Sequence, residues 1–306
     1  MSMRRKALGV IGVVVLGLAA GGGAAPAKLR VLLLSGANNH DWKTTTPALV
    51  KLLDESGRFA VTVTDEPAKL DAASFARYDV IVSNWTPWPN VKQRIWDAAT
   101  EKAFVDFIRG GGGLVVFHAA STAFAGWEEF RHMACGTWGK GTGHGPRHEF
   151  TVTIADKAHP ITAGMADFAI FDELWHRTAL HPKAKVLCTA LAAKDRRGTG
   201  EDEPVAVYTR FGKGRGFYLV LGHDVRAMSA AGWRTLMLRG TEWAATGKVT
   251  ISLAAGGAGG GADLDAALKA IFDYKFGQSR KPLAAVEKLI SAAATDPVRR
   301  RKAAAA

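Results

Sequence analysis

The stretch that decides the fold is Gly110-Gly111-Gly112-Gly113-Leu114-Val115-Val116-Phe117-His118-Ala119-Ala120-Ser121. Four glycines lead into a short apolar run rich in β-branched residues, and the run ends at a histidine followed by small residues. This pattern is typical of a buried parallel strand that delivers a polar side chain to a strand-to-helix turn. Because ligands bind outside the carboxyl ends of the strands in an open α/β sheet, we expect chemistry at His118.

Strand and helix patterns alternate around this stretch. Predicted strands cover residues 29–35, 59–64, 78–85, 149–154, 205–210 and 216–221, and short strands or turns cover 167–174 and 185–190. Predicted helices cover residues 98–109 and 233–245, and another starts at Pro47 with Thr46 as its cap. The alternation predicts an α/β fold with a doubly wound, mostly parallel sheet of the flavodoxin-like type.

The N-terminal 27 residues have the plan of a secretory signal peptide. Arg4, Arg5 and Lys6 precede an uncharged apolar run, and small residues ending Ala25-Pro26-Ala27 follow it. We predict cleavage after Ala27, and export of a bacterial protein to the periplasm or the exterior. The alternative is an uncleaved membrane anchor, but the run is interrupted by glycines and is short for a span, so we expect no stable membrane insertion after cleavage.

The C-terminal segments also differ from the body, which is the predicted α/β domain of residues 28–253. Residues 254–262 are a Gly/Ala linker, and residues 263–306 have helical spacing interrupted by Pro282, which predicts a helical hairpin. The apolar faces of this hairpin need a partner surface. A protein partner, further helical repeats and docking on its own domain are the open alternatives.

Composition excludes two classes of partner. The net charge is +12, of which +3 lies in Arg4, Arg5 and Lys6 and +4 in residues 262–306, leaving +5 for the body. The body has no basic stripe with interleaved aromatic residues, so we expect no nucleic-acid binding. Gly139-Lys140 lacks the spacing of a phosphate-binding loop, so we expect no nucleotide.

The sequence has two cysteines, Cys135 and Cys188, and their spacing is not that of a metal site. Two alternatives remain for them: a disulfide between the two, or two buried free thiols.

Histidine follows three of the predicted strands. His40 follows the first, His118 the fourth and His223 the last. Because the carboxyl ends of parallel strands lie on one edge of a sheet, these residues are expected to converge. The alternative for each is a structural histidine that hydrogen-bonds to its surroundings.

Two further segments offer groups of the same chemistry. The glycine-rich residues 136–148 present His144, and Asp172-Glu173 provides carboxylates that can act as base or as hard metal ligand. The alternative for residues 136–148 is a mobile surface loop, and the alternative for Asp172-Glu173 is an exposed acidic turn. Histidine nitrogens with one carboxylate are typical of a zinc-like divalent site, which would activate water or polarise a sugar carbonyl.

With these residues in view, the chain resembles the trehalose-utilisation (ThuA-like) family, whose fold is like that of the class I glutamine amidotransferases. The matching segments are residues 35–42, 111–121, 124, 127–130, 143–144, 159–162, 164, 172–175, 212–215 and 221–223. In an amidotransferase of this fold a cysteine nucleophile follows the glycine-rich strand, at the position that resembles His118 here. The resemblance therefore does not imply a thiol glutaminase. Trp175 stands where the family more often has tyrosine.

The resemblance implies a carbohydrate-active protein with a small-molecule carbohydrate as its substrate, whereas the expectation of export rests on the signal peptide, which is not a general feature of the family. Our hypothesis is a hydrolase or lyase that acts on a glucoside or a trehalose-type keto-disaccharide. The predicted ligands of a divalent ion are His118, His144 and His223, and the predicted catalytic residues are His118, Asp172, Glu173 and His223. The predicted substrate-binding residues are Asn39, His40, Trp42, Trp85, Ser121 and Trp127. The alternative is a non-catalytic sugar-binding or scaffold module on the same fold.

Overall fold

A computed structural model describes residues 27–253 of the chain. The predicted signal peptide up to Pro26, the Gly/Ala linker and the C-terminal hairpin lie outside the described residues. Among the helices described, none has the length and apolar character needed to cross a membrane.

The described residues alternate between strands and helices, as the pattern predicted. The strands are β1 (Leu29–Leu34), β2 (Phe59–Thr64), β3 (Val80–Ser83), β4 (Gly113–Phe117), β5 (Gly136–Thr137), β6 (Gly143–His144), β7 (His148–Ile154), β8 (Phe168–Asp172), β9 (Trp175–His176), β10 (Ala179–Leu180), β11 (Lys185–Leu191), β12 (Asp202–Phe211) and β13 (Gly214–Leu219). The α-helices are α1 (Trp42–Glu55), α2 (Ala72–Phe75), α3 (Ala98–Gly110), α4 (Glu128–Met133), α5 (Val225–Ser229) and α6 (Ala231–Thr246). Short 3₁₀ helices are η1 (Pro67–Lys69), η2 (His118–Thr122) and η3 (Lys194–Arg196).

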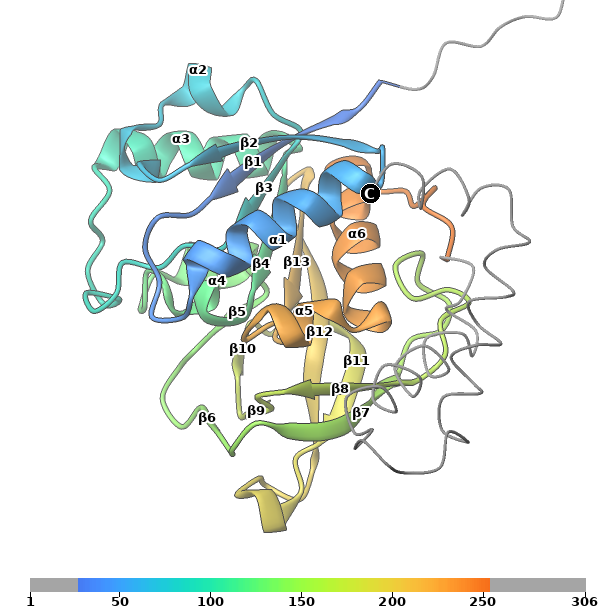
Figure 1. The fold of residues 1–306 in the computed structure, drawn as a ribbon. Coiled ribbons are helices and arrows are strands. Elements are labelled where there is room, and N and C mark those ends of the chain that lie inside the picture. Colours follow the sequence, from blue (N-terminus) through green and yellow to red (C-terminus); the bar gives the residue numbers. More distant parts are fainter. Residues whose placement is uncertain (1–26, 254–306) are drawn as a thin grey trace, which may run out of the picture.

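A nine-stranded sheet with the order β2-β1-β3-β4-β13-β12-β11-β7-β8 organises the molecule (Figure 1). The pairs from β2 to β13 are parallel, and the pairs from β13 to β8 are antiparallel. In the parallel part Leu34 pairs with Ser83, and Phe117 pairs with Leu219, so these strands end at one edge. The predicted α/β fold is confirmed.

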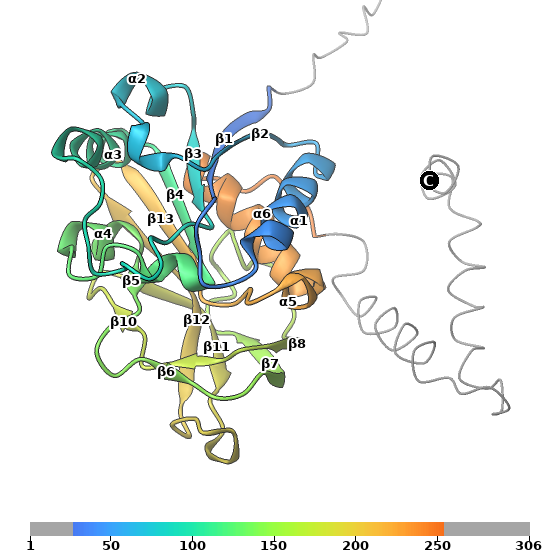
Figure 2. The ribbon, with the colours of Figure 1, turned by 60° about the vertical axis from the view of Figure 1, so that its left-hand side comes forward.

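Helices cover both faces of the parallel part of the sheet. In Figure 2, α1, α5 and α6 lie on one side of it and α2 and α3 on the other. The close approach of α6 explains one of the four glycines before β4, because a Cβ atom on Gly113 would lie 2.5 Å from the carbonyl carbon of Ala244. Strand β4 is buried throughout, as its unbroken apolar run predicted.

Helix α1 begins earlier than the sequence pattern predicted. It starts at Trp42, and the side chain of Asp41 caps it by accepting a hydrogen bond from the Thr44 N–H at 3.3 Å. Pro47, predicted as the first helical residue, lies inside the helix. The physical reason is that Asp41 satisfies one of the free N–H groups of the first turn, so the helix extends back to the loop that carries His40.

Candidate metal centre

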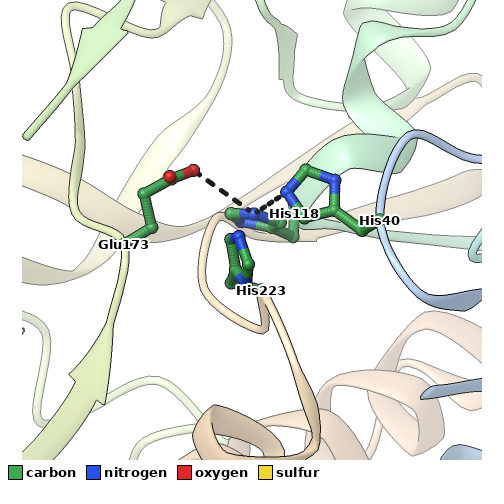
Figure 3. A group of neighbouring side chains, drawn as sticks. All are labelled: His40, His118, Glu173 and His223. Atoms are coloured by element: carbon green, nitrogen blue, oxygen red, sulfur yellow. Dashed lines mark hydrogen bonds and ion pairs between the residues drawn. The ribbon is translucent and has the colours of Figure 1, made fainter. Parts of the chain in front are cut away.

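Four side chains from separate segments converge at the carboxyl edge of the sheet. His40 lies in the loop after β1, His118 is the first residue of η2 after β4, Glu173 follows β8, and His223 follows β13. One potential ligand atom from each of the four lies within 4.8 Å of the others. Figure 3 shows the four side chains directed at one another from their separate loops. We call this group the four-residue centre.

His118 is fixed by its backbone and by one hydrogen bond. It has a φ of +41°, which is uncommon for a residue with a side chain, and it is 2% exposed. Its Nδ1 lies 2.9 Å from the carbonyl oxygen of Val220. Because a carbonyl only accepts, Nδ1 carries the proton, and the lone pair of Nε2 faces the centre. A metal-binding histidine is commonly oriented in this way.

His40 and His223 complete the histidine part of the centre. His40 Nε2 lies 3.2 Å from His118 Nε2, and the ring centroids of His40 and His223 are 4.4 Å apart. The Nδ1 atoms of His40 and His223 are buried and have no hydrogen-bond partner among the described residues. Asn38 supports this loop, because its Oδ1 accepts from the His40 N–H at 3.0 Å and its amide donates to the Asn84 carbonyl.

Burial keeps these imidazoles neutral. Burial and then the nearby His223 lower the pKa of His40 to about 4. Burial and the adjacent His40 hold the pKa of His118 well below its ordinary value, and burial also lowers the pKa of His223. Neutral imidazole is the form that coordinates a metal ion, so the electrostatics of the site suit that role.

Glu173 joins the histidines through one oxygen and faces His144 through the other. Its Oε2 accepts from the indole N–H of Trp175 at 2.8 Å and lies 3.7 Å from His118 Nε2. Its Oε1 lies 3.0 Å from His144 Nδ1. His144, predicted as a ligand, therefore lies beside Glu173 and outside the four-residue centre, whereas His40, predicted to bind substrate, is part of it.

Asp172 differs from Glu173 in what its carboxylate contacts. Its two oxygens accept hydrogen bonds from the backbone N–H groups of Glu173, Gly222 and His223. Burial raises the pKa of Asp172 to about 7, against the lowering effect of those N–H groups. Since both oxygens are occupied by backbone donors, Glu173 is the better placed of the two predicted bases.

The other predicted substrate-binding residues fall into two groups. Trp85 and Trp127 are buried and pack with Phe124 in an aromatic cluster, and Ser121 is buried with its hydroxyl 2.8 Å from the Tyr218 hydroxyl. Asn39 is exposed and Trp42 is half-buried, on either side of His40. Of the substrate-binding residues predicted in these two groups, only Asn39 and Trp42 are exposed enough for a ligand to contact them.

Both cysteines are buried and unpaired. Burial raises the pKa of the Cys135 thiol well above its ordinary value and that of Cys188 to about 12. The structure therefore has two buried free thiols and no disulfide between them. Because burial keeps both thiols protonated, neither is suited to act as a nucleophile.

The donor set fits a divalent metal ion of the zinc type. Three neutral imidazoles and one carboxylate are ligands that zinc uses, and the centre draws them together from distant parts of the chain. His118 Nε2 and His40 Nε2 face each other there, 3.2 Å apart (Figure 3). The four-residue centre can therefore hold a metal ion.

Fold and site together define an α/β protein with a half-parallel, half-antiparallel sheet and a histidine at the turn that follows the glycine-rich strand. The chain matches the model of the trehalose-utilisation family, ThuA, over residues 30–244, and it belongs to that family. A comparison with curated proteins finds no match.

Solved structures agree with this assignment. The crystal structure of a ThuA-like protein from Parabacteroides merdae ATCC 43184 is 30% identical, with a TM-score of 0.67, over 74% of this chain and 93% of that one. A ThuA-like protein from Bacteroides uniformis ATCC 8492 is 19% identical, with a TM-score of 0.56, over 75% and 96%. A β-galactosidase from Rahnella sp. R3 is 14% identical, with a TM-score of 0.50, over 72% of this chain and 32% of that one, which shows a shared fold alone.

Proposed function

We propose that this chain is an exported bacterial enzyme that cleaves a glucoside or a trehalose-type keto-disaccharide, by hydrolysis or by elimination, at the four-residue centre. The observation that carries the proposal is the convergence of His40, His118, Glu173 and His223 at the carboxyl edge of the sheet. Membership of the trehalose-utilisation family supports a carbohydrate as the substrate.

A divalent ion held by the centre would supply Lewis acidity toward a sugar oxygen and toward water. Glu173 is the candidate base, because it is the carboxylate among the histidines. In hydrolysis a base takes a proton from water, and in elimination it takes one from the carbon next to a carbonyl, so a carboxylate at this position can serve either reaction. His144 has a 42% exposed side chain beside Glu173 Oε1, which gives that oxygen a route for protons to solvent.

A cavity of about 430 Å³ lies beside the His40 loop, lined by neighbours of the four-residue centre and by none of its members, and we take it as the candidate sugar pocket. Its lining residues are Ser35, Gly36, Trp42, Lys43, Thr46, Pro47, Val63 and Asp65. Trp42 and Val63 offer an apolar face, and Val63 is 46% exposed. Lys43 and Asp65 offer polar groups for hydroxyls. An indole face beside a few polar groups is a common way to bind a sugar ring.

Metal content and turnover test the proposal together. The change is His118→Asn, because asparagine tolerates a positive φ better than alanine does. We expect stoichiometric metal by elemental analysis of the purified wild type, and cleavage of trehalose or its keto derivative by chromatography. Both should be lost in His118→Asn, with a melting temperature within a few degrees of wild type.

The matched control is His181→Ala. His181 stacks on His132 with ring centroids 4.0 Å apart, outside the four-residue centre, so this variant should keep metal and turnover. Calorimetric titration with trehalose and its keto derivative completes the test. Saccharide binding by a wild type with neither metal nor turnover would reject the enzyme in favour of a sugar-binding module.

A further inference from the structure

Asp172 is a buried carboxylate whose hydrogen-bond partners are three backbone N–H groups. It is the last residue of β8 and is 1% exposed. Its Oδ2 accepts from the Gly222 N–H at 2.7 Å, and its Oδ1 accepts from Glu173 at 2.8 Å and from His223 at 3.2 Å. We call these three hydrogen bonds the Asp172 bridge. Two of the three donors belong to residues of the four-residue centre.

The bridge joins strands that are distant in the sheet. Strand β8 is the last strand of the order, four positions from β13. In a flat sheet with about 4.8 Å between strands, their ends would be roughly 19 Å apart. The antiparallel part instead turns across the ends of the central strands, as Figure 1 shows for β7 and β8, and Asp172 meets Gly222 directly.

We infer that Asp172 is a positioning residue for the metal centre: it keeps Glu173 and His223, whose ligand atoms lie within 4.8 Å of each other, close enough to share an ion. The inference rests on the proposed function, because it concerns the same centre. Glu173 and His223 come from two strands with no shared ladder, so their spacing depends on what ties the strand ends together. The Asp172 carboxylate ties the two strand ends together, because it accepts hydrogen bonds from the residues that follow both strands.

Other contacts also hold β8 in place, including its ladder with β7, which runs as far as the pair His148 and Asp172. The guanidinium of Arg226 lies 3.4 Å from the ring centroid of Phe171, and a Cβ atom on Gly232 would meet the ring of Phe168, so α5 and the start of α6 pack on β8. The helix contacts involve side chains along the strand, and neither they nor the ladder involve the bridge donors. Removal of the bridge should therefore loosen the ligands while β8 stays docked.

The test compares two buried carboxylates. Asp172→Asn leaves one acceptor oxygen and turns an amide N–H₂ toward a backbone donor, so at least one hydrogen bond of the bridge is lost. The matched control is Glu242→Gln, because Glu242 is also fully buried and accepts backbone N–H groups, from Thr250 and Ile251, away from the centre. Zinc affinity is measured by competition titration, and ligand geometry by the visible spectrum of the cobalt(II)-substituted protein.

We expect zinc affinity to fall about 10- to 100-fold in Asp172→Asn, which is typical when a partner that orients a ligand is removed. The cobalt spectrum should change in Asp172→Asn and stay unchanged in Glu242→Gln. Asp172→Ser, which is smaller and keeps one acceptor, is the second variant and should act in the same direction. Wild-type affinity in a folded Asp172 variant would overturn the inference, as would an equal loss in Glu242→Gln.

Hydrogen exchange separates this inference from the proposed function. If the wild type binds neither zinc nor cobalt, the metal centre itself is rejected. The bridge is then tested on the metal-free protein, where the amides of Glu173, Gly222 and His223 should exchange faster in Asp172→Asn than in Glu242→Gln. Equal exchange of these amides in the two variants would overturn the bridge on its own.

Discussion

Trp175 contacts two members of the four-residue centre through different parts of one indole ring. Its N–H donates to Glu173 Oε2 at 2.8 Å, and its ring centroid lies 4.5 Å from that of His118. Trp175→Phe keeps an aromatic ring against His118 and removes the donor. We expect zinc affinity to fall about tenfold, because an outer hydrogen bond to a ligand typically contributes that much or more. Competition titration with a chromophoric chelator measures it.

Trp138 provides the control for this substitution. It packs edge-on against Trp175, with ring centroids 4.6 Å apart, and makes no hydrogen bond to Glu173. Trp138→Phe therefore changes the packing around the indole without changing the donor. Its zinc affinity should stay within about threefold of wild type. If Trp138→Phe lowered the affinity as much as Trp175→Phe, packing would be responsible and not the N–H group.

The histidines show how far single residues could be predicted. The rule that polar residues gather where parallel strands end identified His40, His118 and His223 as neighbours, and the structure brings them together. The same rule gives no information on the direction of a side chain, so it did not show that His40 points at His118 and His223. His144 belongs to a glycine-rich segment, where no periodicity constrains the backbone, and its position beside Glu173 could not be read from spacing.

At the scale of elements, Glu242 ties helix α6 to the segment that follows it. Its carboxylate accepts hydrogen bonds from the Thr250 hydroxyl, from the Thr250 and Ile251 N–H groups, and from the guanidinium of Arg58 at 2.7 Å. Glu242→Gln should lower the free energy of unfolding by about 3 kcal/mol, because it leaves buried donors without an anionic partner. Urea unfolding at pH 7 measures the loss.

The loss should depend on pH with a defined sign. Burial alone would raise the pKa of Glu242, but the hydrogen bonds from Thr250, Ile251 and Arg58 outweigh it, so the pKa lies below its ordinary value of 4.5. A carboxylate with a lowered pKa in the folded state stabilises the fold above the unfolded-state value, and this contribution disappears as the pH falls through the folded-state pKa. Wild type and Glu242→Gln should therefore converge in stability toward pH 3. A constant difference from pH 7 to pH 3 would contradict this assignment.

Elements in the two halves of the chain were not equally predictable. Strands β1, β3 and β4 contain apolar runs, β2 alternates, and helices separate all four, so this rhythm defines a parallel sheet. The antiparallel half has short or irregular strands: β11, for example, pairs with β12 through register shifts near Cys188. The turn of β8 back toward β13 depends on long-range contacts such as the Asp172 bridge, which leave no periodic signal in the sequence.

For the whole molecule, sequence reasoning identified the sheet and the edge at which chemistry is expected, because both follow from strand order and burial. It did not identify the exact ligand group, because Glu173 reaches the histidines only after the antiparallel half has turned across the sheet. The four residues of the centre span positions 40 to 223 and come from four separate segments. The centre therefore exists only in the folded chain, which ties metal binding to the stability of the whole domain.

This coupling predicts that zinc raises the melting temperature. An unfolded chain cannot hold the four ligands together, so zinc at about 100 times its dissociation constant should stabilise the fold by about 2.7 kcal/mol. For a domain of this size that corresponds to a rise of about 5–10 °C. Differential scanning calorimetry with zinc, then with a chelator, measures the rise and its reversal. His118→Asn should show no rise, and His181→Ala should show the full one. A rise of equal size in His118→Asn would mean that zinc stabilises the protein from some other place, and the four-residue centre would lose its assignment.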